Sequence, residues 1–330
     1  METTAFTPQT NGENVVRKKK KVRLSRIIFI VLFLLMPTLN FLLFYVYVNV
    51  DSFLMAFKFV EKGQVQWGFS NFVNFYNEIV RDKGELYLAL VNTLKTWFLT
   101  FCMFPISFFV SVFIYRKILG GQVFRVIFQI PGLLSATIVS SLYIMLCNNT
   151  GYGTPTSSVG ALSSLVQKLF DLPYAPSLLG EERWANTFVF VNIIWLSFPG
   201  DMIIWGGTLS RIPDSVIESA KLDGASWWTE TVKIIIPMVW PTVALKLVLM
   251  TTGILGASGN VFLLTSKGAY GTQTLSNWMY LKIYSQGGYL KKGNALNYLS
   301  AVGLVFTAIT AVLVIIVRQI TKKMDTEVQF

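Results

Sequence analysis

The sequence contains no histidine and only two cysteines, and charged residues make up just 14% of its 330 residues. The lack of histidine removes the commonest metal ligand and the usual acid–base group near neutral pH, which argues against a metalloenzyme and against a histidine proton relay. Cys102 and Cys147 lie in or beside apolar runs, so we expect packing residues rather than a disulfide or a metal site. The charged fraction is well below the roughly 25% of soluble domains.

Long apolar runs account for the low charge. Hydrophobic residues reach 53%, and the mean hydropathy is +0.54. A helix needs about 20 mostly apolar residues to cross a bilayer, and the runs that meet this length are 27–50, 88–115, 122–147, 185–209, 240–264 and 296–318. The sequence therefore predicts an all-α polytopic membrane protein with six transmembrane helices. The first run is too long for the apolar part of a signal peptide, so we expect it to remain as a span.

Basic residues are divided unevenly between the two sides of these spans. With the N-terminus inside, the cytoplasmic segments hold sixteen basic and eight acidic residues, and the outer segments hold ten basic and eight acidic. This bias predicts that both termini are cytoplasmic. The layout is then a basic tail over 1–26, a transmembrane domain over 27–320 and a short tail over 321–330. The cluster Arg17–Arg26 fits a topology signal and a contact with anionic lipid better than a nucleic-acid site.

Three local patterns predict structure within or between the spans. Pro131-Gly132 is expected to kink or unwind the third span. In the outer connection 148–184, residues 160–170 predict a short amphipathic helix whose apolar face carries Leu162, Leu165, Val166 and Leu169. In the outer connection 265–295, Leu275–Tyr284 predicts a re-entrant or interfacial helix.

The cytoplasmic connection between the fourth and fifth spans, 210–239, is charged and patterned although it joins two membrane helices. Pro213-Asp214-Ser215 fits a helix start, with proline near the first turn and Asp214 and Ser215 available as caps. Asp223-Gly224 ends this helix, because glycine readily takes the left-handed conformation of a C-cap. A second helix is expected from Ala225-Ser226 toward Pro237. The segment is therefore predicted to form a helix–turn–helix on the cytoplasmic face.

This segment resembles the EAA loop of the permease subunits of ATP-binding-cassette importers. The family pattern, E-A-A-x-x-D-G-A followed after eight residues by I-x-L-P and a second proline, is met with two conservative departures, Ser219 for alanine and Ile236 for leucine. The resemblance assigns coupling to an ATPase to Glu218, Ser219, Ala220, Asp223, Gly224, Ala225, Ile234 and Pro237. Phe124–Pro131 also resembles the family's F-R-x-x-F-x-x-P, and the strongest likeness is to carbohydrate permeases of the maltose-transporter type.

The resemblance implies a type I importer permease in a bacterial plasma membrane that moves a sugar or oligosaccharide by alternating access. It also implies a second homologous permease, two ATPase subunits and an external solute-binding protein as partners. The sequence has no Gly-Lys dipeptide and hence no Walker A loop. We therefore expect ATP and magnesium on the partner ATPase, no cofactor, metal or catalytic residue on this chain, and a transport subunit rather than an enzyme.

Polar and aromatic residues inside the spans are candidates for a substrate path. A sugar site needs hydrogen-bonding side chains and an aromatic surface for the C–H face of the ring, and polar groups inside a membrane face a cavity or another helix. The candidates are Asn192, Trp195, Tyr143, Thr252 and Asn260, of which Asn192 and Trp195 lie three apart on one helix. Packing between helices is the alternative role for each of them.

Asp201 is the one acid expected inside a span, where it either pairs with Lys246 or extends to the interface. Two alternative functions follow from these residues and the family. One is a secondary transporter that uses Asp201 as its coupling acid. The other is an ATP-binding-cassette permease for a non-sugar solute, such as an amino acid or a polyamine. A membrane enzyme is disfavoured, because the sequence offers no histidine and no convincing acid pair or nucleophile–base set.

Overall fold

The computed structural model describes residues 24–61, 63–116, 120–150, 158–258, 260–284 and 289–324, and it divides into two units, residues 1–52 and 53–330. Within the described residues, five helices are long and apolar enough to cross a membrane, and a bent pair of helices is a candidate for a sixth span. This is the all-α membrane architecture that the sequence predicts. Most of the predicted basic tail and residues 325–330 lie outside the described residues.

The first unit is one long apolar helix. It consists of α1 (Leu24–Asn40), a π-helical stretch η1 (Phe41–Tyr47) and α2 (Val48–Ala56), which runs on past the end of the unit. All described side chains from Ile28 to Val50 are exposed. A helix that is apolar all round, with exposed side chains on every face, fits a span surrounded by lipid. The stretch from Ile28 to Ala56 is long and apolar enough to cross a membrane, and it contains most of the predicted first span.

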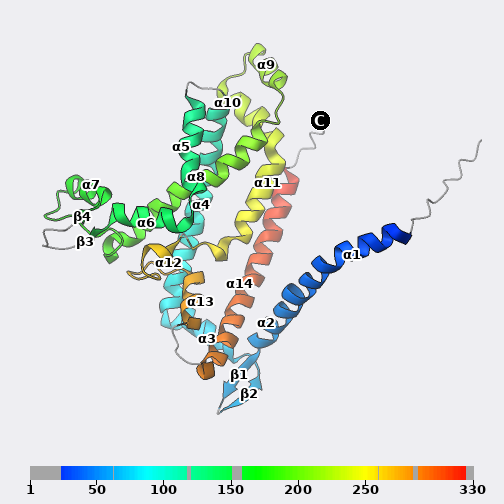
Figure 1. Cartoon of the computed structure of the whole chain (residues 1–330), viewed down its shortest axis with the longest axis vertical. Helices are drawn as coiled ribbons and strands as arrows, with labels where there is room; N and C mark the ends of the chain where they lie inside the picture. Colours follow the sequence, from blue (N-terminus) through cyan, green and yellow to red (C-terminus); the bar gives the residue numbers. More distant parts are fainter. Residues whose placement is uncertain are drawn as a thin grey trace, which may run out of the picture. The chain divides into compact units, whose positions relative to one another are not determined.

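Four long helices run through the second unit (Figure 1). They are α4 (Glu85–Tyr115), α8 (Glu182–Leu209), α11 (Ile236–Thr252) and α14 (Tyr289–Lys323). α4 packs along α8, and α11 packs along α14. The predicted spans 88–115, 185–209 and 296–318 each lie inside one of these helices. The helix predicted over Leu275–Tyr284 is also confirmed as α13, which shares an apolar core with α4 and α14.

The fifth span differs from its predicted range of 240–264. α10 (Trp227–Glu230), the π-helical turn η3 (Thr231–Ile235) and α11 form one continuous helix, so the span begins at Trp227. In a regular α-helix, the ring of Pro237 would clash with the carbonyl of Lys233, four residues earlier. The wider π-helical turn just before Pro237 makes room for the ring. The helix ends at Thr252, because the glycines that follow favour turns over helix. A 3₁₀ turn, η4 (Ile254–Gly256), and the short α12 (Val261–Leu264) come next.

The third span is broken into α5 (Gly121–Leu133) and α6 (Ala136–Cys147), which meet at 102°. The span is broken, as predicted, but the break does not lie at Pro131-Gly132. The helix continues through both residues and ends at Leu133. A new helix starts beyond the break because the Ser135 hydroxyl accepts a hydrogen bond from the Ile138 N–H at 3.3 Å, as an N-cap. Gly132 allows α5 to approach α8 closely, since a Cβ there would lie 2.5 Å from the Cβ of Pro199.

The segment between the first two spans folds into a hairpin that the sequence analysis did not predict. β1 (Lys58–Glu61) and β2 (Gln64–Trp67) pair antiparallel and are followed by α3 (Ser70–Asn77) and the π-helical turn η2 (Glu78–Asp82). The buried Asn71 amide supports this turn of chain by donating to the carbonyls of Ala56 at 3.0 Å and Lys58 at 2.8 Å. The hairpin and α9 (Asp214–Leu222) lie at opposite ends of the unit (Figure 1).

The helix predicted over 160–170 is present as α7 (Ala161–Leu169), after the short paired strands β3 (Asn149–Thr150) and β4 (Ser158–Val159). On its predicted apolar face, Val166 is buried and Leu162 half-buried, while Leu165 and Leu169 are exposed. The buried side instead includes Ser163, whose hydroxyl donates to the carbonyl of Pro176. The chain that returns toward α8 covers this side, so tertiary contacts rather than apolar periodicity decide which face is buried.

Candidate functional site

The short helix α9 follows α8 and ends in a glycine cap. Gly224 has φ +74°, the left-handed conformation that favours glycine. The N–H of Gly224 donates to the carbonyl of Lys221 at 3.1 Å, and the N–H of Ala225 donates to that of Ala220 at 3.0 Å. These two bonds form a Schellman motif, which satisfies carbonyls that a helix end otherwise leaves unpaired. The predicted C-cap is confirmed, and it turns the chain sharply toward α10.

The predicted N-terminal caps of α9 are wrong. Pro213 occupies the N-cap position without a side-chain hydrogen bond, and Asp214 is the first residue of the helix. An acid in the first turn still interacts favourably with the positive end of the helix dipole. A serine cap does occur in this segment, but one helix later: the Ser226 hydroxyl accepts from the Thr229 N–H at 3.3 Å and starts α10. The predicted helix–turn–helix is therefore confirmed, with its second helix continuing directly into the fifth span.

Apolar side chains anchor this segment to three spans. Ile212, just before α9, is buried in a core with Trp205 of α8, Phe108 of α4 and Val239 of α11. The Tyr115 hydroxyl, at the end of α4, donates to the carbonyl of Ile212 at 3.4 Å. Because burial in a shared core fixes Ile212 relative to the spans, a displacement of α9 would be passed on to them.

A buried ion pair holds the start of the fifth span against the end of the second. Glu230 of α10 is 2% exposed and pairs with Arg116, the residue after α4. Trp227 lies under the Arg116 guanidinium, at 5.9 Å, and Trp228 stacks on Phe109 of α4 with ring centres 5.8 Å apart. The sequence analysis did not pair Arg116 with Glu230. Pairing across more than a hundred residues leaves no local signal.

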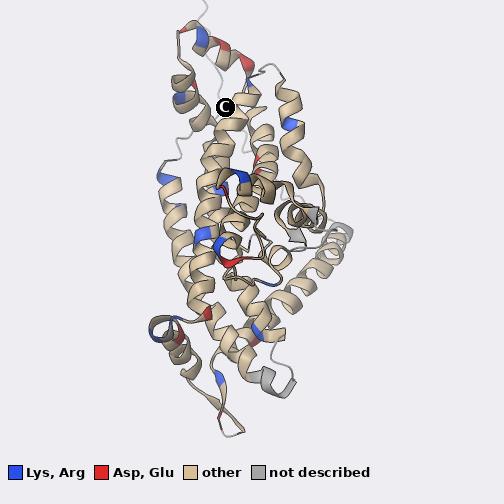
Figure 2. Cartoon of the chain, turned by 90° about the vertical axis from the view of Figure 1, so that its left-hand side faces the viewer, with Lys and Arg blue, Asp and Glu red and all other residues tan. Residues whose placement is uncertain are grey.

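The eight residues assigned to coupling fall into two groups. Glu218, Ser219, Asp223 and Gly224 are exposed, while Ala220 is buried and the remaining three, Ala225, Ile234 and Pro237, are half-buried. Charged residues of both signs lie along α9 (Figure 2). Leu222, beside the cap, is 88% exposed, which is unusual for a leucine at a structured position. The exposed group and Leu222 form a surface that this chain leaves uncovered.

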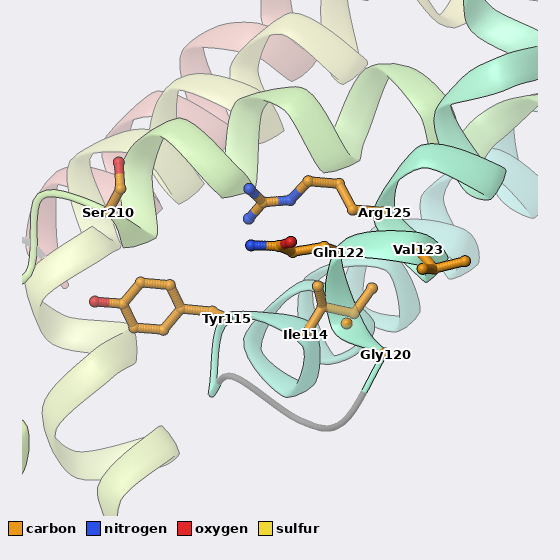
Figure 3. A pocket seen from close by; sticks show the side chains of 8 residues that line it. Ile114, Tyr115, Gly120, Gln122, Val123, Arg125 and Ser210 are labelled. Atoms are coloured by element: carbon orange, nitrogen blue, oxygen red, sulfur yellow. The ribbon is translucent and has the colours of Figure 1, made fainter.

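Two cavities lie near α9, and the first of them adjoins this surface at Glu218. One, of about 630 Å³, lies between α9, α10 and the end of α4, and is lined in part by Arg116, Glu218 and Glu230. The other, of about 580 Å³, lies where the ends of α4, α5 and α8 meet. Figure 3 shows Arg125 and Gln122 extending side by side from α5 into this second cavity, with Tyr115 and Ser210 on the other side. The end of the unit that carries α9 is therefore indented as well as charged.

A second polar site lies between the spans. Asp201 of α8 pairs with Lys246 of α11 at 2.5 Å, and its second carboxylate oxygen accepts from the Ser107 hydroxyl of α4 at 2.9 Å. The predicted pairing of Asp201 with Lys246 is confirmed, and extension of Asp201 to the interface is excluded. The two side chains and Ser107 link three spans through polar contacts.

This ion pair lines a cavity of about 380 Å³. Asn192 is completely buried at its edge, and neither its amide nitrogen nor its amide oxygen has a hydrogen-bond partner among the described residues. Asn260, in a left-handed conformation with φ +57°, lies on the cavity wall from the loop before α12. The remaining lining residues are Thr100, Ile193, Leu196, Ser197, Met250, Gly256 and Ser258. The structure thus brings two of the five substrate-path candidates together.

The other three candidates lie elsewhere. Trp195 stacks on Tyr143 of α6 with ring centres 6.2 Å apart, and the Tyr143 hydroxyl donates to the carbonyl of Phe188 at 2.7 Å. Thr252 is exposed, and its hydroxyl donates within its own helix to Leu249 at 2.7 Å. None of the three lines the 380 Å³ cavity. Within the described residues, no group of three or more His, Cys, Asp or Glu side chains could hold a metal ion.

Comparison with known proteins connects this architecture to one transport class. No protein-family model matches the chain. It is 27% identical over 235 residues to the alpha-glucoside transport system permease protein AglF of Rhizobium meliloti, covering 69% of this chain and 67% of AglF. It is 25% identical over 257 residues to the multiple sugar-binding transport system permease protein MsmF of Streptococcus mutans, covering 77% and 81%. A bacterial ABC transporter involved in alginate import superposes with a TM-score of 0.72 over 91% of this chain, at 20% identity.

The chain therefore resembles the permease subunits of ATP-binding-cassette importers over most of its length. The permease is a multi-pass membrane protein and a transport subunit rather than an enzyme, as the sequence predicts. The solved transporter confirms the fold. The permease spans 51% of another relative, the maltodextrin transport system permease protein MdxF of Bacillus subtilis, so some relatives carry long additional segments.

Proposed function

We propose that the permease moves a saccharide into a bacterial cell, driven by ATP that a separate subunit hydrolyses. The named relatives support a sugar: AglF is named for alpha-glucosides, MsmF for multiple sugars and MdxF for maltodextrin. The proposed partners are a second homologous permease, two ATPase subunits and an external solute-binding protein. The last of these is supported by a solved transporter that resembles this chain and was crystallised with a saccharide-bound periplasmic protein. ATP and magnesium would bind the ATPase subunits, and both termini of the permease would lie in the cytoplasm.

The proposed mechanism depends on one continuous helix that joins the EAA-like segment to the polar cavity. The helix runs from Trp227 to Thr252, and it bears Glu230 at its start and Lys246 and Met250 on the cavity wall. At 1.5 Å per residue, 26 residues span about 39 Å. A rigid element of this length passes a rotation at one end to the other, which is the requirement for alternating access.

The exposed surface of α9 would receive that force. Leu222 would enter an apolar groove of the ATPase as an anchor, since helix-in-groove docking uses apolar side chains that protrude from a helix. Glu218, Ser219, Asp223 and Gly224 would surround it. Ala220, Ala225, Ile234 and Pro237 would act from inside, by keeping the two helices packed and the turn tight.

The proposed substrate path runs through the 380 Å³ cavity, where Asn192 and Asn260 would contact the sugar. Trp195 and Tyr143 form a stacked pair that would offer an aromatic surface farther along the path. Thr252 would contribute to packing at the end of α11.

The comparisons do not favour the two alternative functions, and the contacts of Asp201 agree. Asp201 has a partner on both carboxylate oxygens, a lysine and a hydroxyl, so its contacts are those of a structural link between three spans. The relatives named for sugars also argue against an amino acid or polyamine as the solute.

Transport assays on the reconstituted complex test this proposal. The permease would be co-expressed with its neighbouring transport subunits, purified as a complex and placed in vesicles with a labelled malto-oligosaccharide and the solute-binding protein. We expect uptake that requires ATP and persists when ion gradients are collapsed. Uptake that follows a proton or sodium gradient without ATP would instead establish a secondary transporter.

A further inference from the structure

We propose that the Asp201–Lys246 ion pair sets the charge selectivity of the cavity, so that it accepts an uncharged saccharide and rejects an acidic one. This inference rests on the proposed function and narrows it to a class of sugar. Asp201 and Lys246 are the only charged residues among the described residues that line the cavity. Their charges cancel, so the cavity is polar without carrying a net charge.

The contacts of Asp201 leave it little capacity to bind a ligand. One carboxylate oxygen contacts the Lys246 ammonium at 2.5 Å and the other accepts from Ser107 at 2.9 Å. Its side chain is only 10% exposed. The role of Asp201 is therefore to hold and neutralise Lys246 rather than to contact the sugar, which makes it a positioning residue.

Lys246 retains hydrogen-bonding capacity toward the cavity. An ammonium group has three N–H donors, and Asp201 takes one of them in the structure. The Lys246 side chain is 22% exposed, so the others can reach a ligand hydroxyl. Because the lysine charge is already balanced, it would act as a donor to a neutral oxygen rather than as a counter-ion for a carboxylate.

The remaining lining groups match the hydroxyls of a neutral sugar. Asn192 offers both a donor and an acceptor, neither of which has a partner within the described residues. The Ser197 hydroxyl donates to Ile193 at 2.7 Å and that of Thr100 donates to Thr96 at 3.0 Å, so both oxygens remain free to accept. A sugar hydroxyl donates and accepts at once, and mixed donors and acceptors suit it. A uronate would bring a carboxylate into the cavity with no uncompensated cation to pair with, which is unfavourable away from water.

Binding measurements on the assembled importer in lipid nanodiscs test the proposal, without the solute-binding protein so that its own selectivity does not intervene. Isothermal titration would compare maltotriose with trigalacturonate, which has the same number of rings but carries a carboxylate on each. The wild-type complex should bind maltotriose at least tenfold more tightly. In D201N, Lys246 loses its counter-charge. The ratio of the affinity for maltotriose to the affinity for trigalacturonate should therefore fall at least tenfold. In the double variant D201N/K246Q, the cavity is neutral again and the ratio should return toward that of the wild type.

Three outcomes overturn the proposal: equal affinity of the wild type for the two saccharides, an unchanged ratio in D201N, or the same shift in D201N and D201N/K246Q. The first is decided on the wild type alone, so it stands even where a variant does not assemble. Failure of the proposed function would look different. In that case neither saccharide would bind the wild-type complex, although the complex retained its ATPase subunits and hydrolysed ATP.

Discussion

Arg116 and Glu230 form an ion pair that joins the residue after α4 to the helix leading into α11. The carboxylate is almost completely buried, and Trp227 covers the guanidinium. This pair lies between the EAA-like segment and the spans, beside the buried Ile212 and Ile235. Both apolar contacts and an ion pair thus connect the membrane helices to the segment that is proposed to receive force.

Removing one partner of this pair should destabilise the permease more than removing both. In R116M, Glu230 remains buried without a counter-ion, and losing one member of a buried pair costs about 3–5 kcal/mol. We expect a clear fall in the melting temperature of the detergent-solubilised protein. Size-exclusion chromatography with fluorescence detection, after heating to a series of temperatures, measures this melting temperature. R116M/E230M should recover part of that loss. R125M is the matched control, since Arg125 is exposed and lies one helix away. Equal melting of R116M and R125M would show that the pair does not stabilise the fold.

Substituting Gly224 should uncouple transport from ATP while leaving insertion intact. A residue with a Cβ costs about 1–2 kcal/mol in the left-handed conformation, and a β-branched residue costs more. Nothing lies within 4 Å of a Cβ built at Gly224, so the effect is conformational rather than steric. We expect G224V to abolish ATP-dependent uptake in vesicles and G224N to retain part of it, because asparagine tolerates this conformation. G207A, in the helical interior of α8 with open space around it, should transport normally. Normal uptake by G224V would argue against a coupling role for this turn.

A charge at Leu222 should prevent association with the ATPase without affecting the fold. The side chain is 88% exposed and makes no core contact, so L222E should melt like the wild type. Truncating or charging an apolar anchor at an interface commonly lowers affinity about thirtyfold or more. Co-purification of the ATPase subunits with tagged permease measures this directly. L169E, on α7 at 73% exposure, is the control for adding a charge to an exposed leucine. Retention of the ATPase by L222E would place the docking surface elsewhere.

Asn192 should matter for transport and not for stability. Its buried amide has no partner among the described residues, so N192L removes an unsatisfied polar group and should leave the melting temperature unchanged or higher. If the amide contacts the sugar, losing its hydrogen bonds should reduce uptake at low substrate concentration about tenfold. T252V serves as the comparison, because Thr252 bonds only within α11 and lies outside the cavity. A drop in stability with unchanged uptake would assign Asn192 to packing.

Local rules predicted much of this chain because they act over short distances. Apolar runs long enough to cross a bilayer located the spans at 88–115, 185–209 and 296–318. The Asp223-Gly224 pair located a helix end, since the left-handed conformation is a property of one residue. The same rules did not predict helix starts and buried faces that are set by contacts with residues distant in sequence. The helix of the fifth span starts at Trp227, where Trp228 packs on Phe109 of α4 and Glu230 pairs with Arg116, the residue after α4. In α7, the chain that packs over the helix decides that Ser163 is buried.

The sequence by itself determined that this is an all-α membrane protein, since composition and run length decide which segments can leave water. Its EAA-like spacing resembled that of one class of transporter. It also located the turn on which coupling is proposed to depend. Only the tertiary structure decided which polar residues meet. Asp201, Lys246 and Ser107 come from three different spans. Arg116 follows α4, and Glu230 lies at the start of the helix that leads into α11. Their pairing depends on helix packing over long sequence separations, and a charge inside a membrane is stable only once packing has brought its partner to it.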